Sequence, residues 1–160
     1  MKKMKSLFLL YIGLLLLPGC SGLKEDPDSL VVVNVLDKKF YKDAHIPGSI
    51  QVSFMDVEEK AKKWSKNKTI VVYCSNYACT ASGSVVRRLT NQGFKNAYAY
   101  KPGAAGWKQA GHSLVGPQKE AYLTAPNEEH AGRRHDALVK EISTKDLKKL
   151  IDKKEQKRAA

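Results

Sequence analysis

The sequence predicts an α/β fold in which a central, mostly parallel sheet is flanked by helices. Short runs rich in β-branched and aromatic residues recur at 30–36, 69–73 and 96–100. Segments whose apolar residues repeat at helical spacing lie between these runs. This alternation is typical of a parallel sheet, because parallel strands need a crossover connection between them.

The predicted strands differ in how continuous their apolar runs are. The run LVVVNVL at 30–36 is almost continuously apolar, which is typical of a strand covered on both faces. The run TIVVY at 69–73 has the same character, and NAYAY at 96–100 gives a third strand. A weaker strand is expected after the His-Ile-Pro-Gly turn at 45–48.

The first helix between the strands is predicted at 55–67. Val57, Ala61 and Trp64 recur there at spacings of four and three, which places them on one helical face. Asp56 is predicted to be the N-cap, because a short side chain with an acceptor oxygen suits that position.

Two further helices follow the second and third strands. The helix predicted at 82–94 places Val85, Val86 and Leu89 on one face. It stops at Gly93. A short helix is predicted at 103–112. Together these elements give the order strand, helix, strand, helix that defines the predicted fold class.

The first residues have the layout of a bacterial targeting segment. A lysine-rich start precedes an apolar stretch at 7–17, which is shorter than the roughly 20 residues that span a bilayer. Such a stretch fits the core of a signal peptide. The ending Leu17-Pro18-Gly19-Cys20 resembles the lipobox of bacterial lipoproteins, whose cysteine is acylated. The resemblance implies a signal peptide at 1–19 and a lipid anchor on Cys20. The alternative is an ordinary secretory signal with a free Cys20 thiol.

The lipoprotein resemblance also implies a location. Residues 20–29 would be a tether that holds the domain at a membrane of the bacterial cell envelope, facing the periplasm. Ser21 favours the outer membrane. If Cys20 is acylated, the remaining cysteines are Cys74 and Cys79, in an oxidising compartment where a disulfide persists.

The chain is strongly basic, with a formal net charge of +12. Removal of the predicted signal peptide, with Lys2, Lys3 and Lys5, lowers this charge by three, to +9. A basic chain favours anionic partners. The basic residues are nevertheless spread along the chain and are not interleaved with aromatic residues as in a nucleic-acid reader. We therefore expect a solvated, lysine-rich surface and no nucleic-acid partner.

Residues 30–116 resemble a rhodanese domain. The segment DAHIPGSI at 43–50 is similar to the family's GHIPGA signature, and IVVYC at 70–74 opens an active-site loop as in that family. The segment GFKNAYAYKPGAAGWKQAGHSLV at 93–115 is similar to the family's last motif. The resemblance implies a three-layer, rhodanese-like fold over 30–116. It also implies sulfurtransferase activity through a cysteine persulfide, with no cofactor and no metal.

The resemblance assigns the nucleophile to Cys74, which directly follows the second buried strand. The thiolate is the reactive form, and a thiol with a pKa of about 8.5 needs help to ionise at neutral pH. The start of the next helix offers a partial positive charge and free N–H groups. A loop curled round the sulfur would hold a thiolate or a persulfide as an anion. The expected substrate-binding loop is Ser75, Asn76, Tyr77, Ala78, Thr80 and Ala81.

The expected reaction moves a sulfane sulfur from thiosulfate or a persulfide to a thiol or cyanide. The loop CSNYACTA departs from the family pattern, because it is longer and has neither arginine nor glycine. Loss of arginine removes a bidentate anion clamp, which favours a protein thiol or persulfide partner over free thiosulfate. Thr80 stands where a cysteine phosphatase needs arginine, so phosphatase activity is not expected. Two other classes stay open: a non-catalytic sulfur or redox carrier, and a protein-binding module.

Cys79 lies five residues after Cys74 and has more than one predicted role. As a resolving thiol it would attack a persulfide or form a disulfide with Cys74. As a packing residue it would fill the helix entrance. A third alternative makes Cys79 the nucleophile. Under oxidising conditions without a sulfur donor we expect a Cys74–Cys79 disulfide, which requires the loop to curl.

The segment 117–160 is predicted to be a linker followed by an amphipathic helix. Ser143 and Asp146 have the spacing of a helix-capping pair. The apolar stripe of the helix is Leu147, Leu150 and Ile151. The helix is either a remnant of a second rhodanese domain or an element that packs back onto the first.

Overall fold

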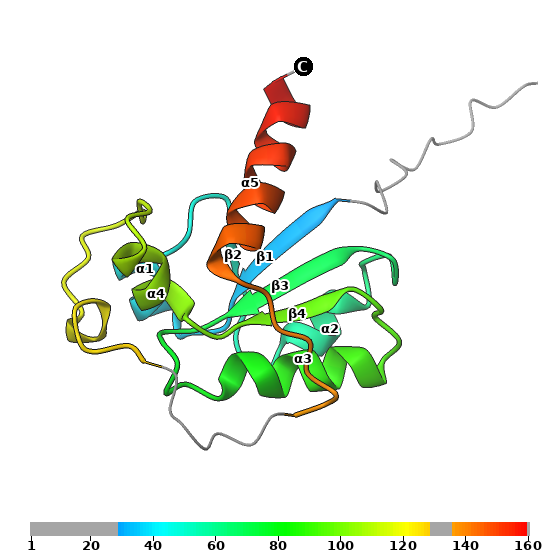
Figure 1. The fold of residues 1–160 in the computed structure, drawn as a ribbon. Coiled ribbons are helices and arrows are strands. Elements are labelled where there is room, and N and C mark those ends of the chain that lie inside the picture. The colour runs from blue at the N-terminus through cyan, green and yellow to red at the C-terminus, as the bar shows by residue number, and fades with distance from the viewer. Residues whose placement is uncertain (1–28, 129–135, 160) are drawn as a thin grey trace, which may run out of the picture.

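Four strands form one parallel sheet at the centre of the computed structural model, which describes residues 29–128 and 136–159 (Figure 1). The strands are β1 (Leu30–Asn34), β2 (Ile50–Gln51), β3 (Thr69–Tyr73) and β4 (Ala97–Tyr100). Their order is β2-β1-β3-β4, and every neighbouring pair is parallel. The predicted α/β class is therefore confirmed. The predicted signal peptide and Cys20 lie outside the described residues.

Helices cover both faces of the sheet, which gives three layers. They are α1 (Lys38–Asp43), α2 (Val57–Ala61), α3 (Ala81–Asn91), α4 (Gly103–Gln109) and α5 (Thr144–Ala159), with a 3₁₀ turn, η1 (Ala121–Leu123). Side chains alternate across a strand. Ile70 and Val72 of β3 therefore join α2 and α3 in one buried cluster, whereas Val71 and Tyr73 join α4, η1 and α5 in another. Figure 1 shows α3 and α5 on opposite sides of the sheet.

The connection between β1 and β3 differs from the prediction. Helix α1 was not predicted, and since none of its residues is buried, it has no apolar periodicity that would reveal it. Helix α2 ends at Ala61, so the helix predicted at 55–67 was too long. Asp56 precedes α2, but its side chain makes no capping hydrogen bond.

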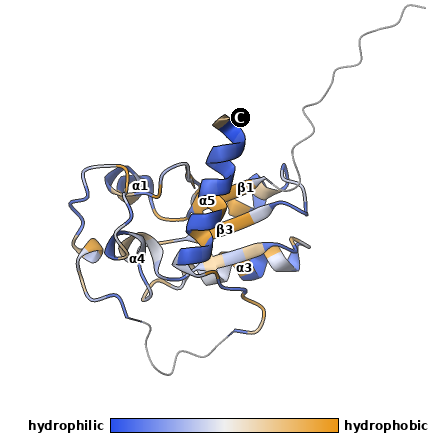
Figure 2. Ribbon diagram, turned by 45° about the horizontal axis from the view of Figure 1, so that its top comes forward, coloured by the Kyte–Doolittle hydropathy of each residue, from blue (hydrophilic) through white to orange (hydrophobic). Residues whose placement is uncertain are grey.

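Helix α5 packs against the sheet on the side of β1. Leu147 and Ile151 are buried there, in the same cluster as the first residues of β1. The predicted capping pair forms, since the Asp146 N–H donates to Ser143 Oγ at 3.1 Å. Figure 2 shows α5 as mostly hydrophilic beside the hydrophobic strands β1 and β3. Over residues 29–128 and 136–159, no helix combines the length and the apolar character needed to cross a membrane.

The segment that leads into α5 covers the edge of the sheet. The Ala99 N–H in β4 donates to the Lys140 carbonyl at 2.8 Å, and the Ile142 N–H donates to the Ala99 carbonyl at 3.1 Å. An exposed strand edge is a template for unwanted pairing. This segment therefore completes the sheet, although its own sequence carries no strand pattern.

Candidate active site

The two cysteines lie in the loop between β3 and α3. Because the strands are parallel, this loop lies at the carboxyl end of the sheet, where α/β proteins place their reactive groups. Cys74 directly follows the last residue of β3, and Cys79 lies two residues before α3 begins at Ala81. The loop curls between them, since the Cys79 N–H donates to the Asn76 carbonyl at 3.1 Å.

Cys74 is fully buried, with 0% of its surface exposed. Its sulfur lies 3.5 Å from the Cys79 carbonyl oxygen, to which the thiol donates, and 3.8 Å from Ser82 Oγ. Cys79 is half-buried and packs against the cluster that contains Cys74. Both thiols are free in this structure. The disulfide predicted for oxidising conditions stays a prediction.

Hydrogen bonding divides the two thiols into an acid and a base. The interaction with Cys79, together with burial, raises the pKa of Cys74 far above its ordinary value, and Ser82 opposes this only weakly. The interaction with Cys74 lowers the pKa of Cys79 to about 6, assisted by hydrogen bonds from Ala81 and Ser75. At neutral pH, Cys79 is therefore the thiolate of the pair and Cys74 is the thiol.

Helix α4 holds the first half of the loop in place. The Ala104 N–H donates to the Cys74 carbonyl at 3.0 Å, and the Ala105 N–H donates to the Ser75 carbonyl at 2.9 Å. Gly103 has φ +64°, and a Cβ at this position would lie 2.5 Å from the Ser75 carbonyl carbon. Only glycine therefore allows α4 to approach the loop this closely.

Asn127 supports the middle of the loop from a distant part of the chain. Its side chain accepts a hydrogen bond from the Tyr77 N–H at 2.8 Å and donates to the Pro102 carbonyl at 2.9 Å. Sequence reasoning missed this residue, because it lies in a segment predicted to be a linker. No local pattern distinguishes it from the other polar residues nearby.

The predicted loop residues differ in how close they lie to the sulfur atoms. Ala78 and Thr80 are exposed, whereas the half-buried members are Ser75, Asn76, Tyr77 and Ala81. Ser75 contributes to the environment of Cys79 through its backbone and its hydroxyl group. Ser82 was not predicted, although it is buried and lies beside the Cys74 sulfur.

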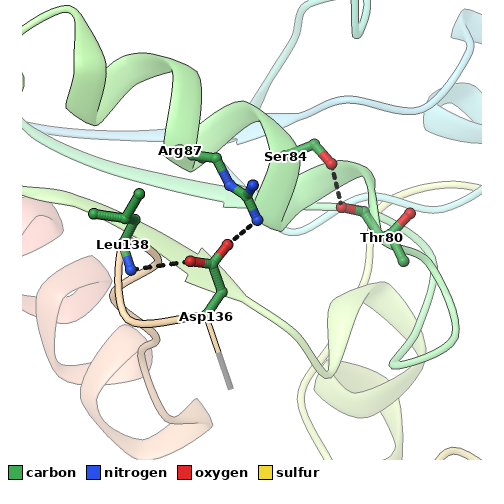
Figure 3. A network of polar contacts seen from close by, with 5 residues as sticks. All are labelled: Thr80, Ser84, Arg87, Asp136 and Leu138. Carbon is green, nitrogen blue, oxygen red and sulfur yellow. Dashed lines mark hydrogen bonds and ion pairs between the residues drawn. The ribbon is translucent and has the colours of Figure 1, made fainter. Parts of the chain in front are cut away.

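The far side of α3 is tied to the chain that leads into α5 (Figure 3). The Ser84 hydroxyl donates to the Thr80 carbonyl at 3.2 Å at the start of the helix. Arg87 pairs with the Asp136 carboxylate, and the Leu138 N–H donates to the same carboxylate at 3.0 Å. Thr80 therefore acts through its backbone here and stabilises the first turn of α3.

One cation lies against the first turn of α3. A Cβ added at Gly83 would lie 2.6 Å from the Lys101 ammonium nitrogen, so Lys101 lies directly over this glycine. Lys101 also lines a groove of about 370 Å³ with Tyr77 of the cysteine loop. It supplies positive charge beside a loop that has no arginine of its own.

The part of the chain that the structure describes contains no group of three metal-ligating side chains placed for a metal ion. His45 has a structural contact instead. Its Nδ1 lies 2.8 Å from the Tyr41 carbonyl, and its ring stacks on the Tyr41 ring at a centroid distance of 4.0 Å.

The fold and the site define a class of protein: a parallel α/β domain with a cysteine loop between a central strand and the next helix. Comparison with known families identifies this class. The family model for the rhodanese-like domain matches residues 21–110. The chain belongs to the rhodanese-like domain family.

The names of several curated relatives of the chain refer to sulfur transfer or sulfur carriage. It is 34% identical over 79 residues to thiosulfate sulfurtransferase GlpE of Coxiella burnetii. That match covers 49% of this chain and 72% of the relative. It is also 29% identical over 83 residues to the putative sulfur carrier protein YrkF of Bacillus subtilis. That match covers 52% of this chain and 44% of the relative.

Solved structures share the fold. The BH2092 protein of Bacillus halodurans matches with a TM-score of 0.51 at 25% identity, over 66% of this chain and 73% of that one. The Alr3790 protein of Anabaena matches with a TM-score of 0.51 at 27% identity, over 55% of this chain and 68% of that one.

Proposed function

We propose that the protein is a sulfurtransferase that carries a sulfane sulfur as a persulfide on Cys74. The observation that supports this most is the thiol pair itself, with a buried acid and a half-buried thiolate in one curled loop at the carboxyl end of the sheet. The family and the names of the relatives point to the same chemistry.

The first step forms the persulfide. In the closed loop Cys74 is the thiol and Cys79 the thiolate, so Cys74 cannot attack until the contact between them breaks. Once the loop opens to admit a donor, the two pKa values approach each other, the Cys74 proton passes to the Cys79 thiolate, and the Cys74 sulfur attacks the sulfane sulfur of the donor. A new S–S bond forms on Cys74, and the bond inside the donor breaks. The departing sulfite or thiolate takes the electron pair. Cys79 thus supplies the base that the loop otherwise lacks. Because Cys74 is buried, residues 75–80 must move before a donor reaches it.

The second step passes the sulfur on. An acceptor thiolate attacks the outer sulfur of the Cys74 persulfide, takes it, and leaves Cys74 as a thiolate that regains a proton. When no acceptor is present, the Cys79 thiolate attacks the Cys74 sulfur instead. This forms the Cys74–Cys79 disulfide and releases hydrosulfide, and an external thiol must then reduce the disulfide.

The surroundings of the loop favour a protein persulfide or thiol as the partner over free thiosulfate. The loop offers no arginine to clamp a small oxyanion, and Lys101 is a single point charge rather than a bidentate clamp. The groove beside Lys101 and Tyr77 extends toward residues 141–144, which gives a larger partner a surface to contact.

A non-catalytic sulfur carrier is the second candidate function. The observation that favours it is the complete burial of Cys74, which protects a bound persulfide but slows its exchange. The relative named a putative sulfur carrier is consistent with this alternative. A carrier binds one sulfur without turnover, whereas an enzyme consumes donor continuously.

A turnover assay tests the proposed function. With a persulfide donor and a thiol acceptor in excess, the wild type should consume many equivalents of donor, Cys74→Ser should consume none, and Cys79→Ser should keep a reduced rate. An active Cys74→Ser protein beside an inactive Cys79→Ser protein would assign the nucleophile to Cys79. A single equivalent consumed by the wild type would favour the carrier.

We also propose that the chain is a lipoprotein of the bacterial cell envelope, anchored through Cys20 and facing the periplasm, with the outer membrane favoured. The support is the Leu17-Pro18-Gly19-Cys20 ending after a short apolar stretch. Metabolic labelling with a fatty-acid analogue should mark the wild type and not Cys20→Ala. Equal labelling of both proteins, or of neither, would contradict the anchor.

A further inference from the structure

A groove of about 600 Å³ lies at the end of the sheet opposite the cysteine loop. Its lining includes Leu30 and Thr69, the first residues of β1 and β3, together with Leu150 of α5. Because the strands are parallel, the groove lies at their amino ends, whereas Cys74 follows a carboxyl end. About 16 Å of strand separates Thr69 from Cys74, at about 3.3 Å per residue.

The second half of α5 gives this groove a cationic wall. The side chains of the wall are Lys153, Lys154, Lys157 and Arg158. Among the described residues that line the groove, none is acidic. Of the acidic residues in this part of α5, Asp152 pairs with Lys148, and Glu155 lines a different groove although its charge still acts on Lys154. Positive charge is therefore collected on one side of the helix.

The cations of this wall are crowded. Burial lowers the pKa of Lys154, and the charges of Arg158 and Lys68 lower it further, against a weaker opposing effect of Glu155. Lys68, directly before β3, is only 5% exposed. Lys154 is half-buried, whereas Lys153, Lys157 and Arg158 are exposed. Like charges this close repel one another, so an anion bound in the groove would be favourable.

The start of the described chain lies in the same place, because Ser29 also lines the groove. The nine residue-to-residue steps from Cys20 to Ser29 span at most about 30 Å when the chain is fully extended. If Cys20 carries the lipid proposed above, the groove lies within that distance of the membrane. The nearest dense array of anions is then the layer of lipid headgroups.

We propose that this groove and the basic end of α5 bind the anionic headgroups of a membrane surface. Figure 1 shows the end of α5 projecting beyond the sheet on the side where β1 begins. Phosphate-bearing headgroups would pair with the cationic wall, and the half-buried Leu150 would contact their less polar parts. The amino end of the sheet would then face the bilayer, and the cysteine loop would face away from it toward its sulfur partners.

Vesicle binding of the full, non-acylated chain tests this inference. Vesicles of phosphatidylcholine alone are compared with vesicles that also contain phosphatidylglycerol. The N-terminal stretch, with Lys2, Lys3 and Lys5, is the same in the wild type and in every variant, so its binding cancels when they are compared on the same vesicles. A double variant, Lys153→Glu with Lys157→Glu, should lose at least about 25-fold in affinity for the anionic vesicles. Each cation near such a surface contributes a factor of about five.

The matched control changes the same charge at the other end of the helix. Lys145→Glu with Lys149→Glu alters two exposed lysines of α5 outside the groove, so its affinity should stay near that of the wild type. Equal losses in both double variants would show that only net charge matters, which would overturn the site. Wild-type binding that ignores phosphatidylglycerol would overturn it as well.

Inorganic phosphate distinguishes a lipid surface from a free anion as the occupant. The proposal predicts that free phosphate displaces vesicles only as strongly as chloride at the same ionic strength, through screening alone. Displacement specific to phosphate would instead indicate a small-anion site and would overturn the lipid assignment. None of these measurements depends on sulfur transfer or acylation, so this proposal and the proposed function can fail separately.

Discussion

At the scale of single residues, the main result is the different environment of two identical side chains. Cys74 and Cys79 are five residues apart, yet one has no exposed surface and the other is half-buried. Their interaction moves the two pKa values in opposite directions. A sequence shows that two thiols are near each other but not which of them ionises, because burial and hydrogen bonding come from the tertiary structure.

This difference predicts the pH dependence of alkylation at Cys79. A pKa lowered to about 6 means that the thiolate dominates above that pH and is lost as the pH falls through it. The rate of alkylation by iodoacetamide should therefore be half-maximal near pH 6 and nearly constant at neutral pH. Peptide mapping by mass spectrometry identifies the labelled residue.

Cys74→Ser provides the control, because the largest cause of the lowered pKa of Cys79 is hydrogen bonding from Cys74. A serine hydroxyl is a different donor, so the midpoint should change, moving toward the ordinary thiol value of about 8.5. A wild-type midpoint already near that value would contradict the division into acid and base.

At the scale of elements, the loop is held by segments that lie far from it in the sequence. Helix α4 contributes N–H donors and Gly103, and the chain after α4 contributes Asn127. The strands β1, β3 and β4 were predictable, because their apolar runs are local and are covered on both faces. Helix α1 and Asn127 were not, since α1 buries no residue and Asn127 acts only through a contact with Tyr77.

Gly103→Ala should show how strongly α4 constrains the loop. We expect a loss of about 3 kcal/mol in the free energy of unfolding, because alanine is strained at φ +64° and its Cβ would meet the backbone of Ser75. Gly93→Ala is a matched control, with φ +88° but nothing within 4 Å of an added Cβ. It should lose only about 1 kcal/mol.

Urea denaturation of both variants measures this difference. Equal losses would mean that backbone strain alone decides the outcome and that the approach of α4 to the loop is unimportant. A larger loss in Gly103→Ala, together with a changed alkylation rate at Cys79, would link the packing of α4 to the chemistry of the loop.

At the scale of the whole molecule, the parallel sheet separates the two thiols from the basic groove. The carboxyl ends of the strands carry the thiol pair, and the amino ends carry the basic groove beside Ser29. The rhodanese-like match ends at residue 110, but the chain beyond it covers the edge of β4 and buries α5 against the sheet. The fold class follows from the order of local patterns, whereas the placement of this last segment depends on contacts that no local pattern encodes.

The central claim is that the sulfur in transit is carried by Cys74, and intact-protein and peptide mass spectrometry after exposure to a persulfide donor test it most directly. The wild type should gain the mass of one sulfur atom on the Cys74 peptide, and Cys79→Ser should retain that sulfur longer, because it lacks the thiolate that resolves the persulfide. Cys74→Ser should gain none. A sulfur atom found on Cys79 in the Cys74→Ser protein, with none on Cys74 in the Cys79→Ser protein, would contradict the claim.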